Sequence, residues 1–225
     1  MLPEGHMQNQ AFIFDMDGTL LDNTGFHTSI WLEVLASLGV QLDHDTFNRR
    51  TAGKTNRQLL REQVGNHLTD GEIEELTQRK ETLYRQRYLP HMRPLSGLIE
   101  FLQAARRLDI PMALATSAGS ENVAFTLKNL ALYDYFQAIV DSTNIHHSKP
   151  HPEMFLTAAC QLGVLAEDCI VFEDSLAGIE AARRAGMRAV VITTTLAQVE
   201  LPEDGILRAL PDFTHLDPAT LGVRR

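Results

Sequence analysis

The sequence contains little cysteine and lacks long apolar runs. No stretch approaches the ~20 apolar residues that a membrane span needs, and residues 1–7 lack the basic and apolar regions of a signal peptide. The two cysteines among the 225 residues, Cys160 and Cys169, stand in apolar surroundings. We therefore expect two buried, reduced thiols and no disulfide framework, in a cytoplasmic protein without a membrane partner.

Positive charge is also scarce. Lys and Arg number 20 against 29 Asp and Glu, which gives a formal net charge of −9. This balance offers no electrostatic support for a nucleic-acid partner. It would also repel a phosphorylated substrate, so a site for one must compensate locally with a metal and a few cations. The length fits one sizeable core with a small inserted domain.

The most informative segment is Asp-Met-Asp-Gly-Thr at residues 15–19, which directly follows the apolar run 11–14. An apolar run that ends in carboxylates and a glycine is typical of a buried strand entering a loop. In an open α/β sheet, ligands bind at the carboxyl ends of the strands. Asp15 and Asp17 could do different jobs there, one attacking or binding a metal and the other moving a proton. The alternative is an Asx-turn that caps an ordinary loop.

Three further apolar runs are followed by side chains that carry chemistry. The run at 110–115 ends in two hydroxyls, the run around 138–140 precedes a lysine, and the run at 169–172 ends in two acids. These polar residues are Thr116, Ser117, Lys149, Glu173 and Asp174. Because a buried charge is costly unless it is paired or bound to a metal, packing alone gives no reason to place acids at strand ends.

Periodicity divides the chain into two parts. Residues 23–93 show helical spacing only, whereas strands and helices alternate from residue 94 onward. Such alternation predicts right-handed parallel crossovers in a doubly wound sheet. We expect an α/β fold, in which residues 8–22 and 94–225 form a Rossmann-like core with a parallel sheet and residues 23–93 form an inserted helical cap domain. The strands after the insertion are expected at 110–115, near 139, at 170–172 and at 189–193.

In this order, the polar residues resemble the haloacid dehalogenase superfamily over nearly the whole chain, from about Phe12 to Val191. Three motifs carry the resemblance: Asp-x-Asp-Gly-Thr, Ser-Lys-Pro-His-Pro-Glu and Glu-Asp-Ser-x-x-Gly-Ile-x-Ala-Ala. More narrowly, the chain is similar to the subgroup that contains β-phosphoglucomutase and many phosphatases of small metabolites. The resemblance implies a phosphoric monoester hydrolase that acts on a small phosphorylated metabolite.

The resemblance also implies a catalytic role for four core residues. Asp15 would be the nucleophile that forms an aspartyl-phosphate, and Asp17 would protonate the leaving oxygen and later activate water. Lys149 would neutralise the phosphoryl oxygens, and Thr116 would donate a hydrogen bond to one of them. Ser117, the next residue, would contribute to substrate binding.

A Mg²⁺ cofactor is implied as well, because two carboxylates that face a phosphate dianion need positive charge. Mg²⁺ prefers oxygen ligands in an octahedral shell that retains water. The resemblance places Asp15, the backbone carbonyl of Asp17 and Asp174 around the ion, with Glu173 beside them. Haloalkanoic dehalogenases of the same superfamily lack the second aspartate and the metal, so these residues favour phosphoryl transfer.

Three cap residues match positions that handle substrate in the mutase: His27, Gly53 and Lys80. Lys80 falls on the apolar face of a predicted long helix, where it either meets a substrate phosphate or snorkels to solvent. A cluster of histidines, by contrast, matches no metal-ligand spacing, and we interpret it as part of a solvated loop. Its members are His146, His147 and His151.

Two departures from the mutase pattern favour water as the phosphoryl acceptor. Asn56 stands where the mutase carries an Arg, with Arg57 displaced by one position. Residues 118–120 read Ala-Gly-Ser where the mutase pattern is rich in Ser, Lys and Asn. Fewer groups then remain to hold the second phosphate of a bisphosphate intermediate.

We therefore predict a monomeric Mg²⁺-dependent phosphatase of a sugar phosphate, and two alternatives remain open. The nearer one is a phosphosugar mutase of the β-phosphoglucomutase type, which shares the first half-reaction. The other is a phospho-acceptor signalling module, since receiver domains also phosphorylate an Asp in a doubly wound sheet. The cap and Asp17 argue against the signalling module, because a signalling Asp should keep its phosphate.

Overall fold

A computed structural model describes residues 10–51, 55–196, 201–202 and 204–221. The chain divides into two compact units. The first, here called the α/β unit, comprises Met1–Asp22 and Arg93–Arg225, and the second, the helical unit, comprises Asn23–Met92. The periodicity predicted a division after residue 22 and after residue 93.

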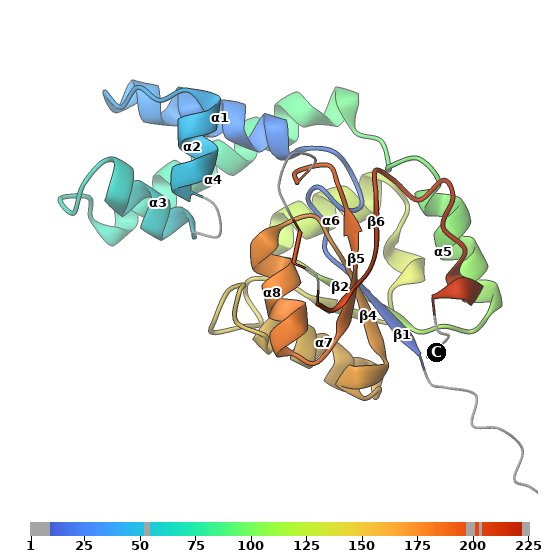
Figure 1. Ribbon diagram of the computed structural model, residues 1–225. Coiled ribbons are helices and arrows are strands. Elements are labelled where there is room, and N and C mark those ends of the chain that lie inside the picture. The colour runs from blue at the N-terminus through green and yellow to red at the C-terminus, as the bar shows by residue number, and fades with distance from the viewer. Residues whose placement is uncertain (1–9, 52–54, 197–200, 203, 222–225) are drawn as a thin grey trace, which may run out of the picture. The chain divides into compact units, whose positions relative to one another are not determined.

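A six-stranded parallel sheet forms the middle of the α/β unit (Figure 1). The strand order is β3-β2-β1-β4-β5-β6, and each neighbouring pair is parallel. The strands are β1 (Ala11–Phe14), β2 (Met112–Ala115), β3 (Ala138–Val140), β4 (Cys169–Glu173), β5 (Arg188–Ile192) and β6 (Ile206–Leu210). The predicted doubly wound parallel sheet is confirmed.

Helices cover both faces of this sheet. They are α5 (Leu98–Arg107), α6 (Ser120–Asn129), α7 (Glu153–Leu162) and α8 (Leu176–Arg184), with short 3₁₀ turns η2 (Tyr133–Tyr135), η3 (Ala166–Asp168) and η4 (Pro218–Thr220). Helix α7 contacts β1, β2 and β3, and α8 contacts β4 and β5. The inner strands β1, β2 and β4 are buried on both faces, which explains why they appear in the sequence as continuous apolar runs.

An aromatic cluster fixes the two central strands against α5. Phe14 of β1 and Phe172 of β4 stack with ring centroids 4.4 Å apart. Phe101 of α5 meets both rings edge-on, at 6.2 Å and 5.2 Å. Each stacked phenylalanine is followed directly by a carboxylate residue, Asp15 or Glu173. The cluster therefore holds the two strand ends from which the site is built.

Strand β6 was not predicted, because the sequence Ile-Leu-Arg-Ala-Leu does not look like the inner strands. It lies at the edge of the sheet and pairs only with β5 among the described strands. Its five residues are all exposed or half-buried. An edge strand needs no continuous apolar run, so its signal in the sequence is weak.

The helical unit contains α1 (Thr24–Ser37), α2 (His44–Thr51), α3 (Asn56–Gln63), α4 (Asp70–Tyr88) and the 3₁₀ turn η1 (Leu89–His91). Capping boxes start two of the helices: Thr55 with Gln58 begins α3, and Thr69 with Glu72 begins α4. Helix α2 was not predicted, since it is strongly polar and contributes only Phe47 to the buried core.

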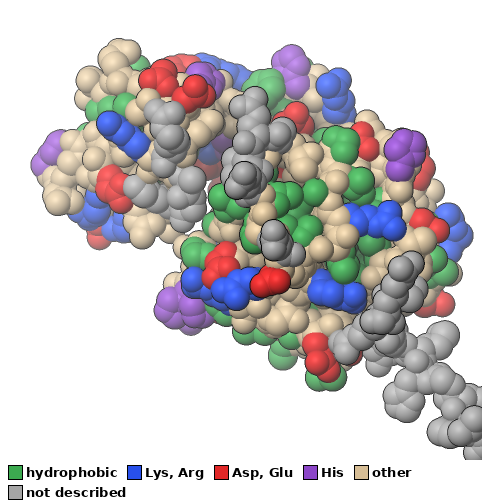
Figure 2. Space-filling view, viewed as in Figure 1, with side chains coloured by type: hydrophobic (Ala, Val, Ile, Leu, Met, Phe, Trp, Pro, Cys, Tyr) green, Lys and Arg blue, Asp and Glu red, His purple; other side chains and the backbone are tan. Residues whose placement is uncertain are grey.

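One expectation about the surface is wrong. Cys160 on α7 is exposed, whereas Cys169 at the start of β4 is buried as predicted. Helix α7 turns Phe155 and Ala158 toward the sheet, and its opposite side carries the thiol. Figure 2 shows Lys and Arg side chains beside Asp and Glu side chains on the visible face. Within the described ranges, no helix combines the length and apolarity of a membrane span.

Candidate active site

The carboxyl ends of the parallel strands bring the predicted core residues to one edge of the sheet. Asp15 follows β1, Thr116 follows β2, and Glu173 ends β4. The backbone N–H of Asp15 donates to the carbonyl of Phe172 (2.9 Å), and that of Thr116 donates to the carbonyl of Val140 (3.0 Å). These bonds continue the sheet ladder, so the backbone at both site residues is fixed by the sheet.

Lys149 joins two carboxylates of this edge. Its Nζ donates to Oδ1 of Asp15 (2.5 Å) and to Oε1 of Glu173 (2.6 Å), and all three side chains are buried. The ring centroid of Phe155 lies 4.9 Å from the same Nζ. Burial alone would lower the pKa of Lys149, but the two carboxylates raise it above its usual value, so the side chain is a fixed cation.

The second oxygen of Glu173 is held by the start of α8. Oε2 accepts from the backbone N–H of Asp174 (2.8 Å) and Ser175 (2.7 Å), and from the Ser175 hydroxyl (2.9 Å). A Cβ atom at Gly178 would lie 1.8 Å from Oε1 of Glu173, so only glycine fits there. Oε2 of Glu173 is thus fixed by the start of α8, and Oε1 holds the Lys149 ammonium next to Asp15. We call this arrangement the brace on Glu173.

Asp174 is a third buried carboxylate, and the two loops beside it hold it. Its Oδ2 accepts a short hydrogen bond from the Thr195 hydroxyl, and the Thr19 hydroxyl lies 3.5 Å from its Oδ1. Gly18 has a φ of +80°, and a Cβ atom there would lie 2.0 Å from Oδ2. Burial, with a further contribution from Glu173, raises the pKa of Asp174 to about 7.

Asp17 lies in the tight turn that follows Asp15. The turn is closed by the N–H of Gly18, which donates to the carbonyl of Leu21 (2.9 Å), and the Asp17 side chain is half-buried. The charge of Asp17 contributes to the raised pKa of Asp174, so the two carboxyl groups are electrostatic neighbours. Asp15 itself bonds a lysine 134 positions away, which an isolated Asx-turn would not require.

Charge at this edge is unbalanced. Asp15, Glu173 and Asp174 each place one carboxylate oxygen within 4.8 Å of the others, and the Lys149 ammonium contacts two of them, Asp15 and Glu173. Burial raises the pKa of Asp15, as it does that of Asp174. A cluster of buried carboxylates with oxygen donors only is the kind of site that suits a hard divalent cation such as Mg²⁺.

The two predicted hydroxyls differ in their surroundings. Thr116 is buried, and its Oγ1 accepts from the backbone N–H of Ala118 (3.1 Å), which orients the hydroxyl group. Ser117 is exposed. The structure thus places Thr116 in the same edge as the acids, with Ser117 on the surface beside it.

In the helical unit, His27 and Lys80 contact each other. Lys80 Nζ lies 2.5 Å from His27 Nδ1 and 2.9 Å from Oε1 of Glu81, with only 2% of the lysine exposed. A lysine that snorkels to solvent is therefore the wrong alternative. Burial, aided by the Lys80 charge, lowers the pKa of His27 well below its usual value. Gly53, the third predicted cap residue, lies outside the described residues.

Sequence reasoning missed two residues of this edge, Thr194 and Thr195. The Thr194 hydroxyl donates to the carbonyl of Gly18 (2.5 Å), and the Thr195 hydroxyl donates to Asp174. Both residues come shortly after the end of β5. Their position as polar residues after an apolar run is the sequence signal that could have identified them. Sequence reasoning also did not predict that Gly178 leaves room for the Glu173 side chain, although Gly178 belongs to the motif Glu-Asp-Ser-x-x-Gly.

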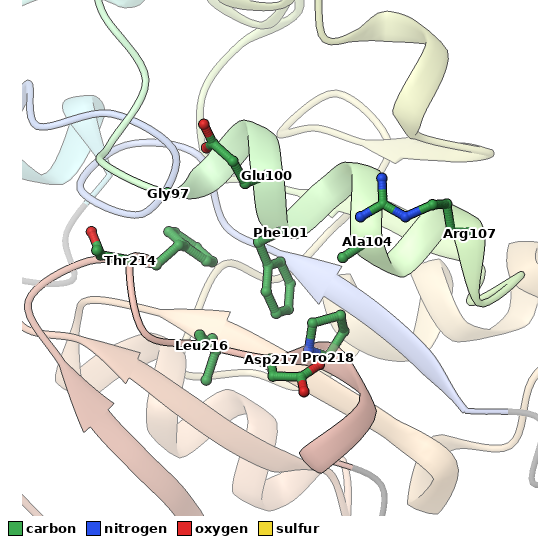
Figure 3. Close-up of a pocket in the computed structure, with 10 residues that line it drawn as sticks. Gly97, Glu100, Phe101, Ala104, Arg107, Thr214, Leu216, Asp217 and Pro218 are labelled. Carbon is green, nitrogen blue, oxygen red and sulfur yellow. The ribbon is translucent and has the colours of Figure 1, made fainter.

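A separate shallow groove of about 570 Å³ lies between α5 and the C-terminal segment (Figure 3). Phe101, Ala104, Leu216 and Pro218 point into it, and Arg107 lies at its rim. The acid cluster, which consists of Asp15, Glu173 and Asp174, does not line this groove. We therefore place the candidate site at the carboxyl edge of the sheet and not here.

Comparison with known proteins identifies the family of the chain. The sequence profile described as haloacid dehalogenase-like hydrolase matches residues 12–192. The chain belongs to this family. It is 36% identical over 182 residues to the fructose-1-phosphate phosphatase YqaB of Escherichia coli, with 80% of this chain and 94% of that protein covered.

Two further matches extend the comparison. The β-phosphoglucomutase of Bacillus subtilis is 34% identical over 213 residues, with 91% of this chain and 92% of that protein covered. A crystal structure of a haloacid dehalogenase hydrolase of family IA, variant 3, from Entamoeba histolytica matches with a TM-score of 0.84 at 28% identity, covering 93% and 96% of the two chains. The predicted superfamily and subgroup are confirmed, and the chain is classified as a phosphoric monoester hydrolase of this family.

Gly178→Ala tests the brace on Glu173. The new methyl group would overlap Oε1 and push Glu173, and with it Lys149, away from Asp15. Because small displacements of catalytic groups are costly, we expect hydrolysis of p-nitrophenyl phosphate to fall by on the order of 100-fold. Gly71→Ala, a helical glycine with no heavy atom within 4 Å of the added Cβ, is the matched control. A Gly178→Ala enzyme with normal kcat would refute the brace.

Asp174→Asn tests whether the buried carboxylate of Asp174 destabilises the fold when a chelator keeps the protein free of metal. The folded-state pKa of Asp174 is about 7, well above the value of about 3.9 that is usual for an aspartate. The folded protein therefore holds an extra proton between these values, and this carboxyl group lowers the free energy of unfolding as pH rises from 4 to 7. We expect the melting temperature of Asp174→Asn to exceed that of wild type increasingly over this interval.

The size of that effect is on the order of a few kcal/mol at pH 8. Glu100→Gln, which neutralises an exposed carboxylate on α5, is the control and should show no such trend. Thermal unfolding followed by circular dichroism in excess chelator is the measurement. If the melting temperatures of wild type and Asp174→Asn differed by the same amount at every pH from 4 to 8, ionised Asp174 would not destabilise the fold.

Proposed function

We propose that this chain is a Mg²⁺-dependent phosphatase that hydrolyses a sugar phosphate through an aspartyl-phosphate on Asp15. The observation that carries the proposal is the buried contact of the Lys149 ammonium with Asp15 and Glu173. A carboxylate held beside a fixed cation at a sheet edge is suited to meet an anionic substrate. A purely structural contact between Lys149 and two carboxylates would not need a third buried carboxylate, Asp174, beside it.

The chemistry proceeds in two balanced steps. Lys149 holds Oδ1 of Asp15, so Oδ2 is the oxygen that attacks phosphorus. The new P–O bond to Asp15 forms as the P–O bond to the sugar breaks, and Asp17 gives its proton to the departing sugar oxygen. Water then attacks the same phosphorus and loses a proton to Asp17. Inorganic phosphate leaves, and Asp15 is regenerated.

Mg²⁺ fits the donor set, because the acids here offer oxygen atoms only and carry more negative charge than Lys149 offsets. We propose Asp15, the backbone carbonyl of Asp17 and Asp174 as its ligands. When bound, the ion would supply positive charge that lets the substrate phosphate approach the carboxylates. Glu173 contributes through Lys149 and the start of α8, since both its oxygens already have protein partners.

The substrate class follows from the relatives. One is named as a fructose-1-phosphate phosphatase and another as a β-phosphoglucomutase, so both names point to phosphorylated sugars. Within this class, Asn56 and the Ala-Gly-Ser of 118–120 remove groups that would hold a second phosphate. They favour water over a sugar hydroxyl as acceptor. His27 and Lys80 remain predicted substrate-binding residues of the helical unit.

Asp15→Asn and Asp17→Asn separate the two carboxylate roles. Asp15→Asn removes the nucleophile at nearly constant shape, so turnover should disappear while the circular dichroism spectrum stays unchanged. Asp17→Asn should keep the nucleophile but lose the proton donor and base, so a phospho-enzyme accumulates and appears in intact-mass spectra. Asp22→Asn, an exposed carboxylate of the same loop, is the control. Substantial turnover by Asp15→Asn would exclude the proposed nucleophile.

Product partition separates the phosphatase from the mutase. With β-glucose 1-phosphate and a trace of the 1,6-bisphosphate, a phosphatase releases free phosphate faster than it forms glucose 6-phosphate. Both products are measured in one time course by phosphate release and by coupled reduction of a nicotinamide. Excess glucose 6-phosphate would instead establish the mutase, with the same nucleophile and acid–base pair.

A further inference from the structure

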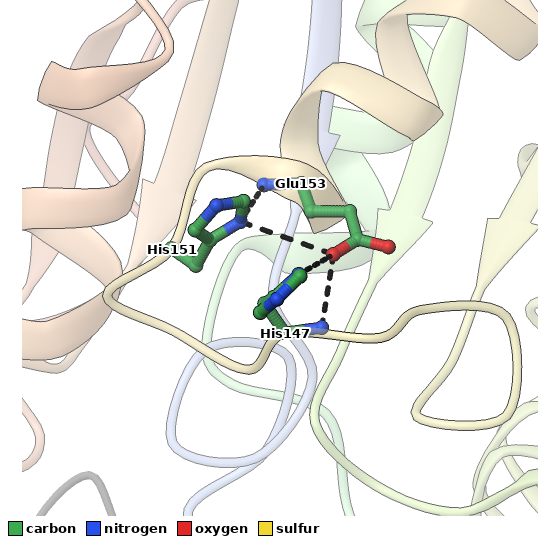
Figure 4. Close-up of side chains that lie close together, drawn as sticks. All are labelled: His147, His151 and Glu153. Carbon is green, nitrogen blue, oxygen red and sulfur yellow. Dashed lines mark hydrogen bonds and ion pairs between the residues drawn. The ribbon is translucent and has the colours of Figure 1, made fainter.

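The loop between β3 and α7 brings two histidines onto one carboxylate (Figure 4). Nδ1 of His147 lies 2.8 Å from Oε2 of Glu153, and Nδ1 of His151 lies 3.9 Å from the same oxygen. The two imidazole rings are 4.5 Å apart between centroids. His147 and His151 are exposed, with 66% and 49% of their side chains accessible, so an ion can reach them.

Glu153 is fixed before any ligand arrives. Its Oε1 accepts from the backbone N–H of His146 (2.8 Å), and its Oε2 accepts from the backbone N–H of His147 (2.9 Å). These two bonds hold the carboxylate of Glu153 at a defined position. The loop therefore presents a carboxylate oxygen with two imidazole nitrogens beside it.

The spacing suits a small tetrahedral ion. Zinc bonds of about 2.0–2.1 Å to nitrogen and oxygen at a tetrahedral angle separate two ligand atoms by about 3.4 Å. The two nitrogen-to-oxygen distances, 2.8 Å and 3.9 Å, lie on either side of this value, and all three ligand atoms lie within 4.8 Å of one another. Rotations of exposed imidazoles can close the difference.

The sequence spacing of the histidines gave no metal pattern, but with Glu153 beside them we propose that His147, His151 and Glu153 form a surface site for a divalent transition metal of the zinc class, with water completing the coordination. Imidazole nitrogen suits Zn²⁺ and related ions, whereas Mg²⁺ prefers oxygen. The site is therefore chemically distinct from the acid cluster at the sheet edge, which offers oxygen only. On binding, the ion would replace the contact of His147 Nδ1 with Oε2 and the hydrogen bond that His151 Nδ1 accepts from the backbone N–H of Glu153 (3.3 Å).

The site encloses a catalytic segment. Lys149 lies midway in sequence between His147 and His151, so the ion would tie together the chain on both sides of this lysine. A clamp of this kind stabilises the folded loop by mass action, and the melting temperature should rise with metal concentration. The inference does not depend on the proposed phosphatase activity, because it concerns binding by a different set of side chains.

Zinc titration by calorimetry tests the site. Wild-type protein is titrated with Zn²⁺ in excess Mg²⁺, so that the oxygen cluster is already saturated with its own ion. We expect one Zn²⁺ per chain, and a loss of affinity by on the order of 10-fold or more in His147→Asn and in His151→Asn. His146→Asn, the adjacent histidine whose backbone N–H still holds Glu153, is the matched control and should bind as wild type does.

Two readouts separate this inference from its rivals. The zinc-dependent rise in melting temperature should vanish in the double variant His147→Asn/His151→Asn and persist in Asp15→Asn. Equal zinc binding by wild type and the double variant would place the ion elsewhere and overturn the proposal. Absence of zinc binding by wild type would also overturn it, and would leave the cluster as a hydrogen-bonded brace of the loop.

Discussion

The site depends on the buried contact of the Lys149 ammonium group with the carboxylates of Asp15 and Glu173. Burying one carboxylate at the end of a strand is costly, and burying three within a few ångströms would be prohibitive without a cation. Lys149 offsets part of this negative charge, and the remaining charge favours the binding of a further cation. The same imbalance makes the cluster suited to a divalent cation.

Two glycines make this charge cluster possible. Gly178 lets the first turn of α8 approach Glu173, and Gly18 lets the turn after β1 approach Asp174 at a backbone angle that few other residues adopt. Backbone N–H groups at the start of α8 then satisfy one oxygen of Glu173. The small residues and main-chain donors around Glu173 and Asp174 therefore support the side chains that position Lys149.

Much of this arrangement could be predicted, because buried parallel strands appear as uninterrupted apolar runs and their polar successors meet at one edge. That logic singled out Asp15, Thr116, Lys149 and Glu173 in the sequence, and the family resemblance supplied the role proposed for each. It failed where the signal was weak or non-local. The edge strand β6 has no apolar run, exposed Cys160 stands among apolar neighbours, and the contact of Thr195 with Asp174 joins two loops whose pairing appears only in three dimensions.

The most direct test of the charge imbalance is a calorimetric titration of Mg²⁺ into chelator-treated protein without substrate. The account predicts one Mg²⁺ per chain in the wild type and an affinity lower by on the order of 10-fold or more in Asp174→Asn, since that variant removes a ligand and the unbalanced charge together. Glu100→Gln controls for the loss of an unrelated carboxylate. Unchanged Mg²⁺ affinity in Asp174→Asn would contradict the account.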